Sequence, residues 1–234
     1  MHAAILTIGN ELVSGDVENS NAAWLARRLQ AGGVRVVLTA AVPDDLERVV
    51  AFVRREAANV DHLLVTGGLG GTPDDITREA IAAAFEVQQE VVPELADDLR
   101  ARFHGAPEYA ARWAALPRGA LPLANPLGGA PGFRIANVWV LPGLPSEMEA
   151  MFDRYAGELR TDRPIESWRR VYRTRESAIV AVLVAATERW SDVLVGSYPS
   201  FPDDGPQVEI VLKSADSDAL AAASAFVEAE LADL

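Results

Sequence analysis

The sequence predicts a three-layer α/β/α domain with a mostly parallel sheet, followed by a small C-terminal α+β module. Two observations lead to this prediction. Over the first two thirds of the chain, short segments that are apolar throughout alternate with segments of helical periodicity, as in sheets that are covered by helices on both faces. A polar stretch at 160–165, which includes Pro164, then separates two predicted domains, 1–162 and 165–234.

The first domain is predicted to open with a buried strand over 3–8, which ends at Gly9. A helix follows, because Asn19, Ser20 or Asn21 can cap its free N–H groups and apolar residues then recur at helical spacing. The later elements are predicted from the same signals, which are the spacing of apolar residues, proline at the start of a helix and glycine at its end. In chain order they are a strand over 34–41, a helix over 44–58, a strand over 60–66, helices over 76–85, 93–103 and 107–115, a loop over 116–132, a hairpin of 133–135 with 138–141, and a helix over 146–159.

The second domain is predicted to be a β-α-β-β-α module. Its elements are a strand over 168–173, a helix over 176–190, strands over 194–197 and 208–213, and a helix from 216 to the end. A module of this size has a small core, so we expect its two helices to pack on one face of its sheet.

The composition excludes several classes of protein. The chain has 234 residues, and 34 acidic against 21 basic residues give a net charge of −13, which opposes binding to nucleic acids and anionic membranes. Cysteine is absent, which excludes disulfides, cysteine-ligated metal sites and thiol nucleophiles. The first residues lack a signal-peptide pattern, and no apolar run reaches the roughly 20 residues that span a bilayer. We therefore expect a cytoplasmic protein that binds neither nucleic acid nor membrane. Its acidic, lysine-poor composition fits salt adaptation and a GC-rich coding bias equally well.

The strongest functional motif is the glycine-rich loop that follows the predicted strand over 60–66. It reads TGGLGGTPDD over 66–75 and holds four glycines in five positions. Glycine permits positive φ and close approach of the backbone, so successive N–H groups can form a concave anion site next to a helix start. One glycine would indicate only a tight turn, but this density predicts a phosphate site. Its residues are Thr66, Gly67, Gly68, Gly70, Gly71 and Thr72.

Two aspartates, Asp74 and Asp75, end this loop. Taken alone, they are most simply helix-capping residues. Beside a phosphate site, however, two carboxylates would repel the ligand unless a divalent cation lay between them, and oxygen ligands with a phosphate suit Mg²⁺ or Mn²⁺. We therefore predict a metal site of Asp74, Asp75 and Glu11, with the two aspartates as the catalytic residues. The alternative for Glu11, which follows the first strand, is a solvated turn residue.

Two further loops are rich in glycine and proline and could line the same pocket. They read NPLGGAPG over 125–132 and LPGLPSEM over 141–148. Asn125 and Ser146 in these loops, with Asn10 after the first strand, are the remaining candidate ligand-binding residues. Ordinary loop stiffening explains either loop when it is taken by itself.

Four motifs in order resemble a known family: IGNELVSGDVENSNAAWLARRL, TGGLGGTPDDITREA, NPLGGAPGF and LPGLPSEM. Together they are similar to the N-terminal region of CinA-type competence/damage-inducible proteins, which have the molybdopterin-binding, MoaB/MogA-like fold. The resemblance covers essentially the whole chain. It implies a stand-alone form without the C-terminal deamidase domain, and a homodimer or homotrimer.

The resemblance implies more than one function. CinA-type proteins of this kind are assigned a divalent-metal-dependent ADP-ribose pyrophosphatase activity, whereas the MoaB/MogA relatives bind molybdopterin and can adenylylate it. Asp74 stands where the pterin relatives have arginine, which favours metal-dependent hydrolysis of a nucleotide pyrophosphate. The alternatives are molybdopterin binding with adenylylation, and a non-catalytic nucleotide- or pterin-binding protein. Gly71 and Gly129 stand where the CinA pattern usually has proline and threonine, so the substrate stays open.

Overall fold

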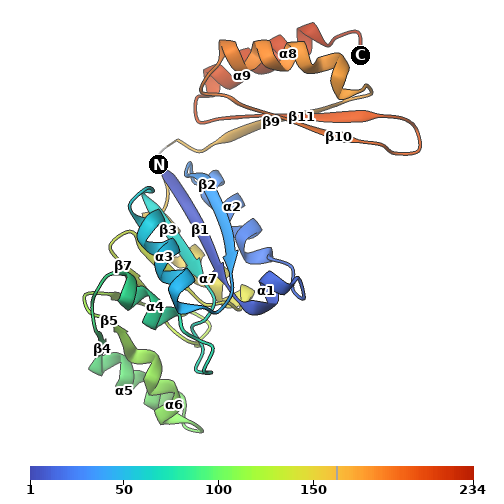
Figure 1. Cartoon of the computed structure of the whole chain (residues 1–234). Coiled ribbons are helices and arrows are strands. Elements are labelled where there is room, and N and C mark those ends of the chain that lie inside the picture. The colour runs from blue at the N-terminus through green and yellow to red at the C-terminus, as the bar shows by residue number, and fades with distance from the viewer. Residues whose placement is uncertain (162) are drawn as a thin grey trace. The chain divides into compact units, whose positions relative to one another are not determined.

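The computed structural model describes residues 1–161 and 163–234, and the predicted end of the first domain at 162 lies outside this part of the chain. The chain divides into two compact units (Figure 1). They consist of Met1–Gln30 with Val34–Arg160, and of Ala31–Gly33 with Thr161–Leu234.

The first unit is built on a six-stranded sheet with the order β2-β1-β3-β8-β7-β6. Its strands are β1 (His2–Ile8), β2 (Arg35–Val42), β3 (His62–Thr66), β6 (Leu121–Leu123), β7 (Gly132–Ile135) and β8 (Val138–Leu141). Strands β1, β2, β3 and β8 run parallel to one another, whereas β7 and β6 pair in antiparallel fashion. The prediction of a mostly parallel sheet is therefore confirmed. In register, Thr7 lies beside Thr66, and Thr66 beside Leu141. The carboxyl ends of β1, β3 and β8 therefore meet.

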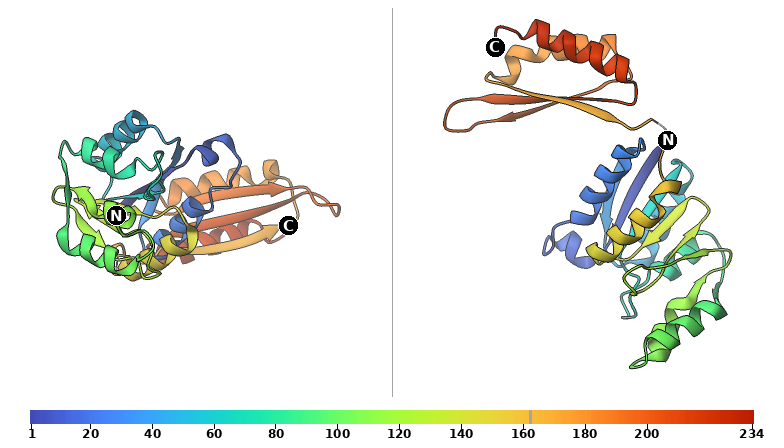
Figure 2. Two further views of the ribbon diagram at one scale, coloured as in Figure 1. Left: turned by 90° about the horizontal axis from the view of Figure 1, so that it is seen from below. Right: turned by 180° about the vertical axis from the view of Figure 1, so that it is seen from behind.

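Helices cover both faces of this sheet, as predicted for a three-layer fold. On one face lie α3 (Leu46–Ala57) and α4 (Thr77–Ala84), which are in front in Figure 1. The right view of Figure 2 shows α2 (Ser20–Ala31) and α7 (Pro145–Tyr155) on the other face. Alternate residues of β1 enter the two cores: Leu6 packs with α3 and α4, and Ile5 with α2 and α7. This is why the strand is apolar at every position.

Several short elements were not predicted. The helix α1 (Asn10–Ser14) follows β1, and β4 (Gln89–Val91) pairs with β5 (Ala115–Pro117). The prediction of a loop over 116–132 is wrong at both β5 and β6, because three-residue strands are too short to show a period. The predicted helices over 93–103 and 107–115 are α5 (Pro93–Arg102) and α6 (Pro107–Ala111), the second followed by a 3₁₀ turn (Arg112–Ala114). They share a small core with Trp113.

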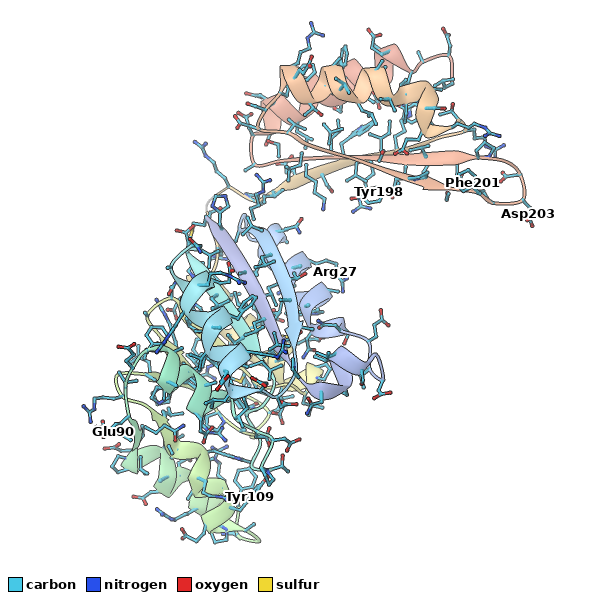
Figure 3. The ribbon with its side chains drawn as sticks, viewed as in Figure 1. Arg27, Glu90, Tyr109, Tyr198, Phe201 and Asp203 are labelled. Carbon is cyan, nitrogen blue, oxygen red and sulfur yellow. The ribbon has the colours of Figure 1, made fainter. Side chains whose placement is uncertain are left out.

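The second unit has the predicted β-α-β-β-α order. Its antiparallel sheet runs β10-β11-β9, and both helices pack on one face through a core that includes Ile210 and Leu212 (Figure 1). The elements are β9 (Glu166–Tyr172), α8 (Glu176–Arg189), β10 (Leu194–Ser200), β11 (Gln207–Ser214) and α9 (Ser217–Glu230). Figure 3 places Tyr198 on the β10–β11 hairpin. Of the helices in the described residues, none combines the length and apolarity that crossing a membrane requires.

A buried histidine lies at the start of β3, at the end of the strand opposite to the glycine-rich loop. The His62 side chain is 8% exposed, and within the described residues neither ring nitrogen has a hydrogen-bond partner. Burial lowers the pKa of His62, and the nearby positive charge of Arg134 lowers it further, against the opposing effect of Asp61. The folded protein therefore binds a proton here less readily than the unfolded chain does.

We predict that His62 makes the protein less stable in mild acid. As the pH falls below about 6.5, the unfolded chain gains a proton that the folded protein resists, so the free energy of unfolding decreases. Replacing His62 with leucine removes this group and flattens the pH dependence, whereas His104→Leu at an exposed position leaves it unchanged. Urea unfolding between pH 8 and 5 measures the free energy of unfolding of the wild type and of both variants. If this free energy depended on pH equally in the wild type and in His62→Leu, the prediction would be contradicted.

Candidate functional site

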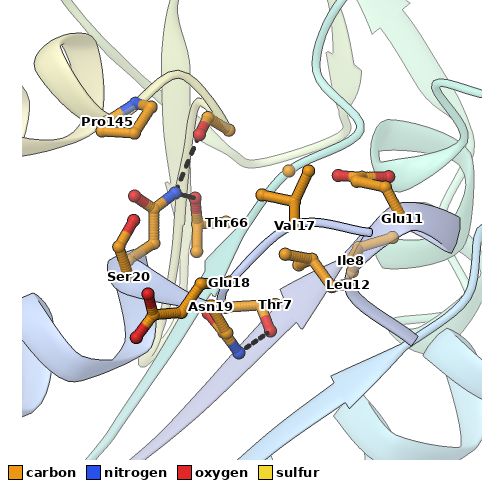
Figure 4. A pocket seen from close by; sticks show the side chains of 13 residues that line it. Thr7, Ile8, Glu11, Leu12, Val17, Glu18, Asn19, Ser20, Thr66 and Pro145 are labelled. Carbon is orange, nitrogen blue, oxygen red and sulfur yellow. Dashed lines mark hydrogen bonds between the residues drawn. The ribbon is translucent and has the colours of Figure 1, made fainter. Parts of the chain in front are cut away.

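A pocket of about 100 Å³ lies where β1, β3 and β8 end (Figure 4), which is the place where ligands bind in open α/β sheets. Its polar lining includes Thr7, Glu11, Asn19, Asn21, Thr66 and Gly67. Three of these were predicted as site residues: Glu11, Thr66 and Gly67. The other three were not.

Side-chain amides and hydroxyls form the polar wall of this pocket. Asn21 Nδ2 donates to the Gly143 carbonyl at 2.8 Å and to Thr66 Oγ1 at 3.4 Å, and Thr66 Oγ1 in turn donates to the Pro142 carbonyl at 2.6 Å (Figure 4). On the β1 side, Asn19 Nδ2 donates to Thr7 Oγ1 at 2.8 Å. In the described residues, the buried Asn21 Oδ1 has no partner. This acceptor oxygen is covered by the protein and its hydrogen-bonding capacity is unused.

Only a weak signal for these amides is present in the sequence. Asn19 and Asn21 were predicted only as caps of the following helix, and Asn19 Oδ1 does accept from the Ala22 N–H at 3.2 Å. Their second hydrogen bonds, to Thr7 and Gly143, join segments that are far apart in the chain. Three polar residues within Asn19–Asn21, directly before an apolar helix, were the available signal.

Two glycines let β3 turn into this site. Gly67 and Gly68 have φ angles of 106° and 62°, which L side chains rarely adopt. A Cβ atom on Gly67 would collide with the Ile8 carbonyl oxygen, and one on Gly68 with Thr77 Oγ1. The glycines are therefore required both by backbone conformation and by close packing against β1 and α4.

The carboxylate of Asp75 binds back onto the glycine-rich loop. Its Oδ1 accepts from the Gly70 N–H at 2.9 Å, and its Oδ2 accepts from the Thr72 N–H at 2.8 Å and the Thr72 hydroxyl at 2.6 Å. The Gly67 N–H donates to the Leu141 carbonyl at 3.3 Å. The structure thus differs from an open nest over 66–72, because an internal carboxylate already occupies part of it.

Acidic side chains gather around this loop. Burial raises the pKa of Asp44, and the negative charges of Glu11, Asp74 and Asp75 raise it further, although a hydrogen bond from the Asn10 N–H opposes the shift. Asp74 is exposed, and a hydrogen bond with Thr72 lowers its pKa. Asp44 is an acid near this loop that the sequence did not indicate, because it precedes a helix and resembles an ordinary capping position.

These acids do not fit a resident metal ion in the present geometry. Within 1–161 and 163–234, no three His, Cys, Asp or Glu side chains are grouped as ligands of one ion. The expected set of Glu11, Asp74 and Asp75 is not assembled, because both Asp75 oxygens are turned onto Gly70 and Thr72.

The other predicted residues lie beside the pocket rather than in its wall. Asn10 Oδ1 accepts from the Asp44 N–H at 3.3 Å and so joins α1 to the start of α3. Asn125 Nδ2 donates to Glu147 Oε2 at 2.9 Å and to the Ala130 carbonyl at 3.1 Å, which holds its loop against α7. Ser146 is exposed. Asn10 and Asn125 have clear structural roles here.

We predict that Asp75→Asn loosens the glycine-rich loop. An asparagine replaces one acceptor oxygen with an NH₂ group that faces N–H donors, which should cost about 1–3 kcal/mol of unfolding free energy. Urea unfolding and amide hydrogen exchange at Gly70 and Thr72 measure the change. The matched control is Asp74→Asn at the exposed neighbouring position, with an expected change within about 0.5 kcal/mol. Equal effects of the two variants would show that the Asp75 hydrogen bonds do not hold the loop.

Each of the two units matches a known protein family model. Residues 4–161 match the family described as probable molybdopterin binding domain. Residues 169–234 match the middle domain of FAD synthase. Among solved structures, a CinA protein of unknown function from Thermoplasma acidophilum is 29% identical, with a TM-score of 0.64 over 68% of this chain and 97% of that one.

Curated relatives extend the similarity along the chain. A CinA-like protein from Citrifermentans bemidjiense is 37% identical over 94% of this chain and 55% of its own length. Another, from Parasynechococcus marenigrum, is 39% identical over 81% of this chain and 44% of its own length. The chain thus spans about half the length of these CinA-like proteins. A protein from Archaeoglobus fulgidus is 35% identical over 85% of this chain and 86% of its own length.

The match over 4–161 and the three-layer fold agree with the four sequence motifs. The chain is similar to CinA-like proteins over about half of their length, and it belongs to the probable molybdopterin binding domain family.

Proposed function

We propose that the chain binds a phosphorylated pterin of the molybdopterin type, with the pterin ring in the pocket at the ends of β1, β3 and β8. The observation that carries this proposal is the wall of side-chain amides and hydroxyls that lines this pocket. A pterin ring presents both donors and acceptors along its edge, which suits such a wall. Adenylylation of the pterin with ATP, and a non-catalytic role as a carrier, both start from this binding step. That the chain forms a homodimer or homotrimer stays a prediction.

The size of the pocket limits what enters it. A volume of about 100 Å³ is well below the roughly 300–1,000 Å³ of sites that enclose a whole drug-sized ligand. One end of the ligand would therefore lie in the pocket, and the phosphate would lie outside it. Gly67 lines the pocket, so the glycine-rich loop is the adjacent surface.

We predict that Asn21→Ala weakens molybdopterin binding about tenfold, which corresponds to ~1.4 kcal/mol. The variant removes one amide of this wall and its hydrogen bond to the Gly143 carbonyl. Fluorescence titration with molybdopterin measures the affinity, and Asn59→Ala at an exposed asparagine outside the site is the matched control with unchanged affinity. If Asn21→Ala binds as tightly as the wild type, the ring does not use this pocket.

A second candidate function is hydrolysis of a nucleotide pyrophosphate such as ADP-ribose. The specific observation in its favour is a group of acids: the negative charges of Glu11, Asp74 and Asp75 all raise the pKa of Asp44. Because these acids do not form a metal site in the present geometry, we assign no step of such a reaction to a metal ion.

We predict that, if this activity is present, the wild type releases AMP from ADP-ribose when Mn²⁺ or Mg²⁺ is added. The double variant Glu11→Gln with Asp74→Asn should then be at least about tenfold slower, because it removes two of the charges. Chromatography of the products measures the rates, and omission of the metal is a further control. Absence of AMP with either metal, or an unchanged rate in the double variant, would reject hydrolysis by these acids.

A further inference from the structure

A second pocket lies in the second unit, and the proposed function does not use it. Its volume is about 200 Å³, compared with about 100 Å³ for the pocket at the ends of β1, β3 and β8. One wall is formed by residues 174–177 at the start of α8, and the other by residues of the β10–β11 hairpin between 199 and 208. All of these residues belong to the same unit, so the pocket is complete within it.

The register of the sheet determines which face this pocket occupies. Val208 pairs with Tyr172 on one side and with Pro199 on the other, and residues that are directly opposite in antiparallel strands point to the same face. Val208 and Tyr172 belong to the core that α8 and α9 cover, so Pro199 also faces the helices. The hairpin extends beyond the start of α8 (Figure 1). At this end the face is therefore open to a ligand.

An exposed aromatic ring forms the apolar part of the pocket. Phe201 is 78% exposed, more than any other large apolar side chain in the described residues (Figure 3). Its backbone is restricted to extended conformations because Pro202 follows it, and the Gly205 N–H donates to the Pro202 carbonyl at 3.0 Å and so closes the next turn. An aromatic ring that is held in water by a stiff backbone is a suitable surface for an apolar group of a ligand.

Two contacts connect the walls of the pocket. The Ser197 hydroxyl donates to the Glu176 carboxylate and thereby ties α8 to β10. Arg173, directly before the first wall, forms an ion pair with Asp204 of the hairpin at 3.1 Å. Both contacts occupy carboxylates near the pocket, which reduces their repulsion of a bound anion.

The polar part of the pocket offers hydrogen-bond donors. Arg175 is exposed, and its guanidinium has no partner in the part of the chain that the structure describes. The same is true of the hydroxyls of Thr174 and Ser177. A planar guanidinium pairs with a carboxylate through two parallel hydrogen bonds. The group that complements this wall is therefore a carboxylate.

The volume limits the apolar group that this carboxylate carries. An engineered protein cavity of roughly 150 Å³ binds benzene, and sites that enclose a drug-sized molecule measure roughly 300–1,000 Å³. A pocket of about 200 Å³ lies between these values. It holds one group of the size of a phenyl ring, without space for the neighbouring residues of a peptide.

We propose that the pocket between α8 and the β10–β11 hairpin binds a small carboxylic acid with one ring-sized apolar group. The carboxylate pairs with Arg175, and the apolar group lies against Phe201 and Pro199. This site goes beyond the proposed function, because it lies in the other unit and takes a ligand of a different chemical class.

NMR titration of the full chain, labelled with ¹⁵N, tests this site with 3-phenylpropionate. We expect the amide signals of Ser177 and Gln207 to shift and those of residues 66–71 to stay unchanged, with a dissociation constant of about 1 mM or lower. The uncharged analogue 3-phenylpropionamide should bind at least about fivefold more weakly, because it cannot form the ion pair.

Substitutions on each wall separate the two parts of the ligand. Arg175→Met should weaken 3-phenylpropionate binding at least about fivefold, and Arg175→Lys, which keeps the charge, should recover part of the loss. The matched control is Arg27→Met at an exposed arginine of the first unit, with affinity within about twofold of the wild type.

On the apolar wall, Phe201→Ala should also weaken 3-phenylpropionate binding at least about fivefold, because the ligand loses its aromatic contact. Its control is Tyr198→Ala, an exposed aromatic position next to Pro199 on β10 and therefore on the opposite face of the strand. Both Arg175 and Phe201 are exposed, so their replacement leaves the core of the unit intact.

The proposal is overturned if the Ser177 and Gln207 signals stay unshifted at about 10 mM 3-phenylpropionate. It is also overturned if the amide analogue binds as tightly as the acid, or if Arg175→Met or Phe201→Ala binds like the wild type. The peptide acetyl-Gly-Gly-Phe carries the same ring and carboxylate at a peptide end, and we expect it to bind more weakly than 3-phenylpropionate. Tighter binding of the peptide would assign the pocket to peptide C-termini instead.

Discussion

Hydrogen bonds from α4 and the adjacent 3₁₀ turn to five consecutive carbonyls determine the chemistry of the candidate site. Thr77 and Arg78 hold the carbonyls of residues 67–70, and Arg112 holds that of Gly71. Because α4 packs into the core through Ala80 and Ile81, its donors are fixed before any ligand arrives. A fixed set of dipoles binds an anion with little cost of reorganisation.

The parallel sheet brings this turn next to the pocket. The carboxyl ends of β1, β3 and β8 meet through the pairing of Thr66 with Thr7 and Leu141. Gly67 belongs to both features, since it lines the pocket and begins the turn. One side of the site therefore offers neutral amides and hydroxyls, and the other is the glycine-rich turn, whose Leu69 and Gly70 carbonyls accept from the buried Arg78 guanidinium. A ligand with a polar ring and a phosphate matches both sides, which agrees with membership of the probable molybdopterin binding domain family.

Much of the fold could be predicted from the sequence, whereas the contacts that make the site could not. The strands at β1 and β3 are apolar at every position because both faces are buried, and this pattern indicates a covered parallel sheet. Glycine density marked the turn correctly as a special segment. The sequence does not indicate where the Asp75 carboxylate points, because an aspartate that caps a helix and one that accepts from the loop occur in the same sequence context. In the sequence, Arg78 resembles an ordinary residue of the first turn of a helix, and only tertiary packing buries it. The hydrogen bond between Asn21 and Gly143 joins residues that are 122 positions apart in the chain.

The account is tested most directly by a crystal structure of the chain soaked with AMP in the presence of EDTA. We predict a phosphate within hydrogen-bond distance of the glycine-rich turn over 67–71, with the Arg78 guanidinium still on the Leu69 and Gly70 carbonyls. A phosphate bound elsewhere, or a turn whose N–H groups face the protein interior while Arg78 contacts the ligand itself, would contradict it.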